Sequence, residues 1–234
     1  MCIIMANKVN YQAVMEQLIK ENCTENKVPR LLLHSCCGPC STYCIEVLSE
    51  FFEVTVFYYN PNIYPPREYE LRVDEQQRFI DEFPTKNKVS FVEGRYDTDT
   101  FYDMARGLED EPEGGKRCFK CYELRLRECV EYATQNGYDF FTTTLSISPL
   151  KNADKLNEIG AKLEKEYNVR YLFSDFKKKD GYKKSTEISK EYNMYRQYYC
   201  GCVYSKKQRD DEIKGGICRW HSYGEDVSQK KQTS

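Results

Sequence analysis

Several features that mark common protein classes are scarce or missing in this chain. It has only two histidines among 234 residues, which argues strongly against a histidine-rich zinc hydrolase site. Neither GxGxxG nor GxxxxGK followed by Ser or Thr occurs, so no phosphate-cradling motif supports nucleotide binding. No apolar run approaches the roughly 20 residues that span a bilayer, and the start lacks the pattern of a signal peptide. We therefore expect a cytoplasmic protein without a membrane partner.

The chain also lacks a large net charge. Its 35 Lys and Arg residues nearly balance 37 Asp and Glu residues, giving a formal charge of -2 and no global attraction to nucleic acid. The densest basic run comprises residues 177–179 with Lys183 and Lys184, and we interpret it as a solvated surface. Residues 221–234 are mostly polar, which predicts a flexible tail.

Cysteine, in contrast, is abundant, with twelve in the chain. Seven of them fall in three short clusters, CCGPC at 36–40, CFKC at 118–121 and CGC at 200–202. A reducing cytoplasm and a chain of this length disfavour a disulfide framework. Soft thiolates select zinc, copper(I) or iron–sulfur clusters over hard cations. The clusters therefore indicate a metal or redox centre.

Strand and helix patterns alternate along the chain. The sequence predicts strands over 30–35, 53–59, 89–92, 140–145 and 170–173, and helices over 41–51, 67–83, 98–105, 118–136, 152–167, 185–194 and 203–213. Strands separated by helices of this length predict an α/β fold with a mostly parallel sheet and helices on both faces. We expect a single domain over 1–220, with a helical extension in about the first 25 residues.

The cysteine clusters are expected at the carboxyl ends of strands, where ligands bind in such sheets. CCGPC follows the first strand, residues 60–62 follow the second, and residues 146–149 follow the fourth. We expect these three strand ends to meet at one crevice. Ser41 is expected to cap the next helix, which would place Cys37 or Cys40 near a helix start where the dipole favours thiolate.

Cys118 and Cys121 have a spacing that allows more than one chemistry. One turn with this spacing donates two ligands to a metal, but the spacing is equally typical of a thioredoxin-like dithiol or half a zinc knuckle. Pooled with Cys36 and Cys37, the pair makes a four-thiolate set adequate for an iron–sulfur cluster.

Cys200 and Cys202 flank a single glycine. Such a pair could close a small, strained disulfide that is easily reduced, as catalytic disulfides are, or it could bind a second metal. We interpret His34, at the end of the first strand, as a packed, hydrogen-bonded residue rather than a ligand. Inert thiols are expected where no partner lies at a useful spacing, namely at Cys2, Cys23, Cys129 and Cys218.

Five ordered motifs together resemble those of the QueH-type epoxyqueuosine reductases. They are LHSCCGPC at 33–40, YNPNI at 59–63, KRCFKC at 116–121, FTTTLSISP at 141–149 and YRQYYCGC at 195–202. The match runs from about residue 31 to 205. The resemblance implies a Rossmann-like fold and a tRNA-modifying oxidoreductase that reduces the epoxide of epoxyqueuosine at the anticodon wobble position, giving queuosine and water.

Site residues and partners also follow from the resemblance. It implies that a [4Fe-4S] cluster is bound by Cys36, Cys37, Cys118 and Cys121, and that a redox-active pair or part of a second, mononuclear iron site is formed by Cys200 and Cys202. Cys40 is a candidate ligand of that second iron, although the chain departs here from the relatives that have an acidic residue at this position. The implied partners are the tRNA anticodon loop and an unidentified electron donor.

Two other functions fit the same thiols. One is a metal-free thiol–disulfide oxidoreductase that uses Cys118 and Cys121, and the other is a zinc-stabilised RNA-binding module. Candidates for contacts with RNA phosphates are Arg67, Arg196 and residues 177–179.

Overall fold

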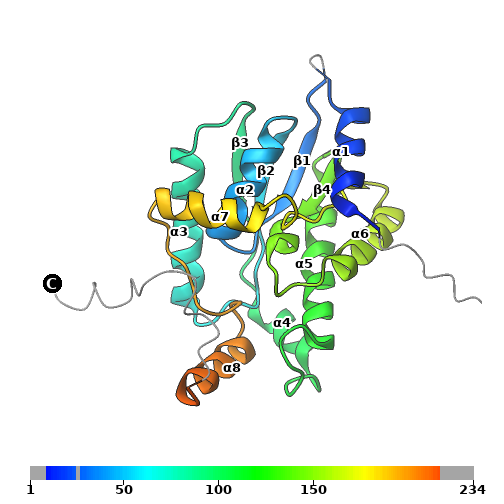
Figure 1. Ribbon diagram of the computed structural model, residues 1–234. Helices are drawn as coiled ribbons and strands as arrows, with labels where there is room; N and C mark the ends of the chain where they lie inside the picture. Colours follow the sequence, from blue (N-terminus) through cyan, green and yellow to red (C-terminus); the bar gives the residue numbers. More distant parts are fainter. Residues whose placement is uncertain (1–8, 25–26, 217–234) are drawn as a thin grey trace, which may run out of the picture.

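The computed structural model describes residues 9–24 and 27–216 of the chain. The predicted tail, together with Cys2 and Cys218, lies outside the described residues. In chain order the elements are α1 (Tyr11–Asn22), β1 (Arg30–His34), α2 (Gly38–Ser49), β2 (Glu53–Tyr58), α3 (Pro66–Glu82), β3 (Val89–Glu93), α4 (Thr98–Ala105), α5 (Lys116–Gln135), β4 (Phe140–Thr143), the 3-10 turn η1 (Thr144–Ile147), α6 (Ala153–Tyr167), β5 (Arg170–Tyr171), α7 (Gly181–Glu191) and α8 (Val203–Lys214) (Figure 1).

A single parallel sheet organises these elements. Its strand order is β3-β2-β1-β4-β5, and each neighbouring pair runs parallel. The chain winds outward from β1 to β3 and then returns to the other side of β1, where β4 pairs with it. The topological switch point, where such folds bind their ligands, therefore lies between the carboxyl ends of β1 and β4. The predicted α/β fold is confirmed.

The sheet is buried on both faces, as the apolar character of β1 predicts. Leu31 and Leu33 pack into one core and Leu32 into the other, because successive side chains of a strand point to opposite faces. Residues of α1, α2, α3 and α7 contribute to the first core, and residues of α5 and α6 to the second. The predicted placement of helices on both faces is confirmed (Figure 1). Within the expected N-terminal extension, α1 buries Met15 and Ile19.

Helix α2 starts three residues before the predicted position, at Gly38. The helix cap is Cys37, and Pro39 lies in the first turn, where its missing N–H would have had no helical partner. Ser41 therefore does not cap the helix as expected; its Oγ donates to the Gly38 carbonyl oxygen at 2.8 Å. This early start places Cys40 inside the first turn, close to Cys37.

Strand β4 ends two residues before the predicted boundary. The Thr143 hydroxyl oxygen accepts a hydrogen bond from the backbone N–H of Leu145 at 3.1 Å, which turns the chain into η1. This turn places Thr144 beside Cys36, whose backbone N–H donates to its hydroxyl oxygen. None of the described helices combines the length and apolar character needed to cross a membrane.

Candidate metal centre

Hydrogen bonds tie together the ends of three strands. The Asn60 side chain, after β2, donates from Nδ2 to the Ser35 carbonyl oxygen after β1 at 2.8 Å. The backbone N–H of Cys36 donates to the hydroxyl oxygen of Thr144, which follows β4, at 3.2 Å. The expected meeting of these strand ends is confirmed, and it puts CCGPC at the switch point of the sheet.

Three thiols converge there. The Sγ atoms of Cys36, Cys37 and Cys40 lie within 4.8 Å of one another, and those of Cys36 and Cys37 are 3.9 Å apart. Two thiolates bound at about 2.3 Å to one tetrahedral metal lie about 3.8 Å apart. Adjacent cysteines can converge because β1 ends at His34, so the alternation of a regular strand no longer applies. This three-thiol group has the geometry to bind a metal ion.

Protons are shared unequally within the three-thiol group. Hydrogen bonds from the Cys36 and Cys40 thiols, with the positive charge of Arg72, lower the pKa of Cys37 well below its ordinary value. The pKa of Cys40 is raised well above the ordinary value, because its thiol donates to Cys36 and Cys37 and is partly shielded from water. A thiolate at Cys37, stabilised by two neighbouring thiols, is well suited to act as a ligand of a soft metal cation.

The other four clustered cysteines lie around one small cavity. Cys118 and Cys121, from the start of α5, face Cys200 and Cys202, from the segment that leads into α8, and the cavity between them measures about 20 Å³. Cys121 and Cys202 are buried against Phe101 of α4. In Figure 1, α8 lies at the same end of the molecule as α4. The fold thus brings CxxC close to CGC, and the ligand set of CxxC with Cys36 and Cys37 stays a prediction.

Arg125 lies between the two thiol groups. It is 2% exposed, and it donates from Nε to the Cys121 carbonyl oxygen at 3.3 Å and from Nη1 to Asn60 Oδ1 at 3.2 Å. Burial opposes its charge, but the thiols of Cys121, Cys200 and Cys36 raise its pKa. Both acceptors are neutral, and buried charges are normally paired. The guanidinium therefore fits a centre that carries negative charge, as metal-bound thiolates do.

A second buried cation, Lys151, contacts one of these four thiols from the loop between η1 and α6. Its Nζ lies 3.2 Å from Cys200 Sγ and 3.5 Å from Glu113 Oε1. Although burial works against the charged amine, Cys200, Tyr122 and Glu113 raise the pKa of Lys151 well above its ordinary value. The sequence reasoning missed both cations, and the only available signal was that Lys151 lies two residues after the FTTTLSISP motif.

Polar atoms near the thiols also lack partners among the described residues. The side chain of Arg72 donates to Glu68 Oε1 at 2.8 Å and to the Cys200 carbonyl oxygen at 3.2 Å, but its Nη2 has no partner. The same holds for the Tyr58 hydroxyl and for Gln197 Oε1, whose side chain interacts with the Cys37 thiol. Buried polar atoms are normally hydrogen-bonded. These three atoms therefore fit a polar or charged group bound beside the thiols.

His34 is a packed residue, as the sequence suggested. Its Nδ1 lies 2.9 Å from Thr143 Oγ1, and its Nε2 lies 3.1 Å from the Tyr59 carbonyl oxygen. Because the carbonyl can only accept, Nε2 carries the proton and Nδ1 accepts from the threonine. Burial, and then the charge of Arg125, lower the pKa of His34 to about 3. The ring is therefore neutral and joins the ends of β1, β2 and β4.

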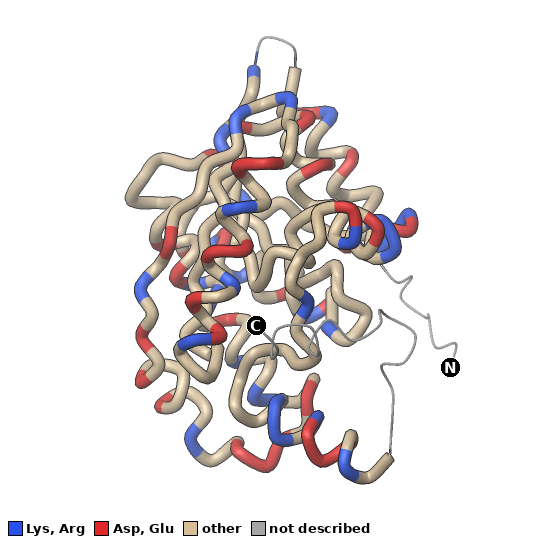
Figure 2. The backbone as a smooth tube through the Cα atoms, turned by 90° about the vertical axis from the view of Figure 1, so that its left-hand side faces the viewer, with Lys and Arg blue, Asp and Glu red and all other residues tan. Residues whose placement is uncertain are grey.

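Two lysines of the basic run form ion pairs with nearby carboxylates. Lys177 contacts Asp175 Oδ1 at 2.5 Å, and Lys179 pairs with Glu16 of α1. Acidic and basic residues are interleaved over the molecule in Figure 2. The interpretation of residues 177–179 as a solvated surface is therefore favoured over a role in binding phosphate.

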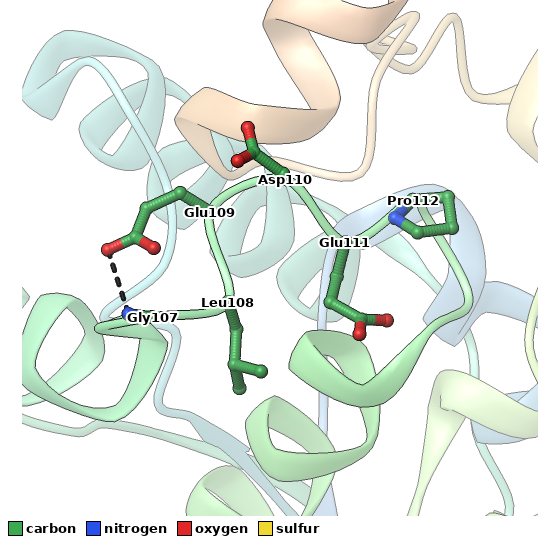
Figure 3. A pocket seen from close by; sticks show the side chains of 6 residues that line it. All are labelled: Gly107, Leu108, Glu109, Asp110, Glu111 and Pro112. Carbon is green, nitrogen blue, oxygen red and sulfur yellow. Dashed lines mark hydrogen bonds between the residues drawn. The ribbon is translucent and has the colours of Figure 1, made fainter.

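A larger cavity, of about 280 Å³, lies in the loop between α4 and α5 and is lined by residues 107–112, none of which is a cysteine. Figure 3 shows that the side chains of Glu109, Asp110 and Glu111 point in different directions and do not converge. Arg117 holds this loop by donating to the carbonyl oxygens of Leu108 and Glu109, both at 2.8 Å. The loop therefore serves as an anchored connection into α5 and offers no convergent binding site.

The parallel sheet with thiols at its switch point defines an α/β protein with a candidate metal centre. Comparison with known proteins then places it in a family, since the model of the family described as epoxyqueuosine reductase QueH matches residues 31–208. The chain belongs to this family and is an oxidoreductase that acts on epoxyqueuosine. The resemblance seen in the sequence is confirmed.

Relatives named epoxyqueuosine reductase QueH cover most of the chain. The protein from Streptococcus pyogenes serotype M1 is 45% identical over 208 residues, which are 88% of this chain and 82% of that protein. The Staphylococcus epidermidis protein is 41% identical over 211 residues, 88% of this chain and 89% of the relative. The Thermotoga maritima protein is 34% identical over 188 residues, which are 78% of this chain and 93% of that protein.

Among solved structures, a U34-tRNA thiolase, NcsA from Methanococcus maripaludis with its [4Fe-4S] cluster, matches at a TM-score of 0.47 and 12% identity, over 88% of this chain and 74% of that chain.

Proposed function

We propose that this chain reduces epoxyqueuosine to queuosine at the wobble position of a tRNA anticodon loop, using iron bound by its clustered cysteines. The proposal is supported by two groups of thiols near buried cations: one follows β1 at the switch point of the sheet, and the other lines a small cavity with Arg125. The reaction needs two electrons and two protons, which convert the epoxide to an alkene and release its oxygen as water.

The proposed ligands of a [4Fe-4S] cluster are Cys36, Cys37, Cys118 and Cys121. These four thiols would hold the cluster, and the buried charge of Arg125, which interacts with Cys36 and Cys121, would offset its negative charge. Cys40 is not part of this set, and we propose it as a candidate ligand of a second iron. When bound, a cluster supplies electrons one at a time, at a potential that depends on nearby charges and hydrogen bonds.

A second store of electrons suits this reaction, because a cluster passes electrons singly. We propose Cys200 and Cys202 for this role, either as a redox-active pair that closes a disulfide when oxidised or as ligands of the second iron. Their four-thiol cavity supports it, since both sulfurs face Cys118 and Cys121. Phe101 packs against Cys202 and Cys121 and keeps water away from them.

The anticodon loop is the proposed substrate element, because unpaired RNA bases are read by stacking on aromatic side chains. Tyr64 is 43% exposed, and its backbone N–H donates to the Gly201 carbonyl oxygen, between Cys200 and Cys202, at 2.8 Å. Tyr102 is 39% exposed and is close enough to Tyr64 and Cys202 that both contribute to raising its pKa, after burial. These two exposed rings lie near Gly201 and Cys202 and are suited to stacking on bases of the loop.

The decisive experiment is reduction of tRNA that carries epoxyqueuosine. Protein reconstituted anaerobically with iron and sulfide is incubated with this tRNA and a chemical reductant, and the nucleosides are analysed by mass spectrometry. We expect queuosine to appear with wild-type protein and not with the Cys118→Ser variant. Epoxyqueuosine that persists despite an intact cluster would overturn the proposal. Stoichiometric zinc, without iron or acid-labile sulfide, in anaerobically purified protein would favour the RNA-binding module instead.

A further inference from the structure

Lys151 is an unusual residue in this site because it is a buried amine in direct contact with a thiol. Its side chain is 7% exposed, and its Nζ lies 3.2 Å from Cys200 Sγ. Lysine is almost never buried without a partner. The segment that carries it is short and anchored at both ends, by the hydrogen bond from the Lys151 N–H to the Ser148 carbonyl oxygen and by the start of α6 at Ala153.

The negative partner of Lys151 is shared. Glu113 lies 3.5 Å from Lys151 Nζ through Oε1 and 3.3 Å from Arg209 Nη2 through Oε2, and its side chain is 9% exposed. One carboxylate therefore faces two cations, so it compensates only part of the charge that Lys151 presents to Cys200. Arg209 in turn contacts Glu212 at 2.5 Å. Charges in such a poorly hydrated site act on one another far more strongly than at the surface.

We propose that Lys151 is a positioning residue that holds the sulfur of Cys200 and raises the reduction potential of the thiol-bound centre, while Glu113 limits the size of this effect. Reduction adds negative charge to the centre, and a fixed cation beside one of its sulfurs stabilises the reduced state. Removing the cation should therefore make the centre harder to reduce, and removing the carboxylate should make it easier. The inference rests on the proposed function, because it requires a redox centre at these thiols.

The test is a redox titration of the reconstituted full-length protein, in which visible absorption reports the reduction of the centre. Lys151→Met is expected to lower the equilibrium constant for reduction at least tenfold, which is about 59 mV for a one-electron couple. Lys151→Arg keeps the charge and should restore most of the potential. The control is Lys162→Met, because Lys162 is 56% exposed on α6 and pairs with Glu123 at 2.8 Å. The control should leave the potential unchanged.

Glu113→Gln supplies a second variant with the opposite expected sign. It removes a negative charge without changing the size of the side chain, so the potential should rise. A role in packing alone would not give shifts of opposite sign in the two variants. If the Lys151→Met variant does not assemble the centre, the result with Glu113→Gln is sufficient. A higher reduction potential in that variant supports the inference, and an unchanged potential overturns it.

The inference and the proposed function fail in different ways. Shifts of opposite sign in a centre that leaves epoxyqueuosine unchanged would support the role of Lys151 and refute the substrate. Normal reduction of epoxyqueuosine, with potentials that move in neither variant, would refute the role of Lys151 and leave the proposed function intact.

Discussion

The amide of Asn60 connects β1 to the buried cation between the two thiol groups. Its Nδ2 donates to the Ser35 carbonyl oxygen at 2.8 Å, and its Oδ1 accepts from Arg125 Nη1 at 3.2 Å. A single side chain from the end of β2 therefore positions both the start of CCGPC and the guanidinium. Asn60 is itself fully buried, so neither hydrogen bond can be replaced by bulk water.

Replacing this amide should destabilise the protein. Asn60→Ala leaves the buried charge of Arg125 without its side-chain acceptor and the Ser35 carbonyl without its donor, and we expect a loss of about 3 kcal/mol in the free energy of unfolding. Urea unfolding of the metal-free protein measures it. Asn136→Ala, at an exposed site, is the matched control and should change stability by less than about 0.5 kcal/mol. Equal effects of the two substitutions would contradict the role of Asn60.

Cys40 should affect the second iron and not the cluster. We expect Cys40→Ser to retain the visible absorption and acid-labile sulfide of the cluster while iron falls by about one atom per chain, because one thiolate of the three-thiol group is lost. Iron and sulfide analysis after anaerobic reconstitution gives both values. Cys23→Ser is the control, since Cys23 caps the end of α1 and belongs to neither thiol group. Loss of the whole cluster from the Cys40 variant would instead make Cys40 a cluster ligand.

Cys202 should separate electron transfer from cluster assembly. Cys202→Ser is expected to keep the cluster and to lose detectable formation of queuosine, because the second store of electrons would be broken. Cluster absorption and nucleoside mass spectrometry on the same preparation report the two properties independently. If the absorption disappears as well, Cys202 belongs to the ligand set.

Tyr64 should contribute to the binding of tRNA without affecting the metal. Loss of one base-stacking ring costs about 1–3 kcal/mol, so Tyr64→Ala should weaken tRNA affinity by about 5-fold to 150-fold at a fixed salt concentration. Tyr64→Phe keeps the ring and should bind nearly as well as the wild type. Filter binding or fluorescence anisotropy gives the affinity, and iron content confirms the integrity of the centre. Unchanged affinity of the alanine variant would remove Tyr64 from the RNA contact.

His34 should make the metal-free protein less stable in acid. Its pKa is lowered to about 3 in the fold, so below the ordinary value of about 6.5 the unfolded chain binds a proton that the folded chain does not. Stability from this group is therefore full above pH 6.5 and decreases as the pH falls, by about 2 kcal/mol at pH 5.

The measurement for His34 is urea unfolding at several pH values, together with NMR of its ring. The chain has only two histidines, so a His221→Asn variant leaves one ring to observe. A ring that titrates above pH 5 would show that the imidazole is not held neutral as described.

The order of strands and helices could be predicted from the sequence because its signals are local. The apolar run before CCGPC, the β-branched and aromatic run at 53–59 and the helical spacing along α5 and α6 each report on neighbours in the chain. Helix starts were less predictable: at α2, Pro39 begins the helix early and Cys37 takes the cap that Ser41 was expected to provide. Such boundaries depend on competition between nearby residues, which composition alone does not resolve.

By itself, the sequence determined the α/β class, the cysteine motifs and the family to which they belong. Only the tertiary structure decided which thiols meet, bringing the CxxC pair of α5 to the CGC pair before α8, some 80 residues later in the chain, and Cys40 to Cys36 and Cys37. It also decided that Lys151 and Arg125 are buried against them. The physical reason is that a buried cation and a shared cavity arise from contacts between distant segments, and these leave no periodicity or spacing in the sequence.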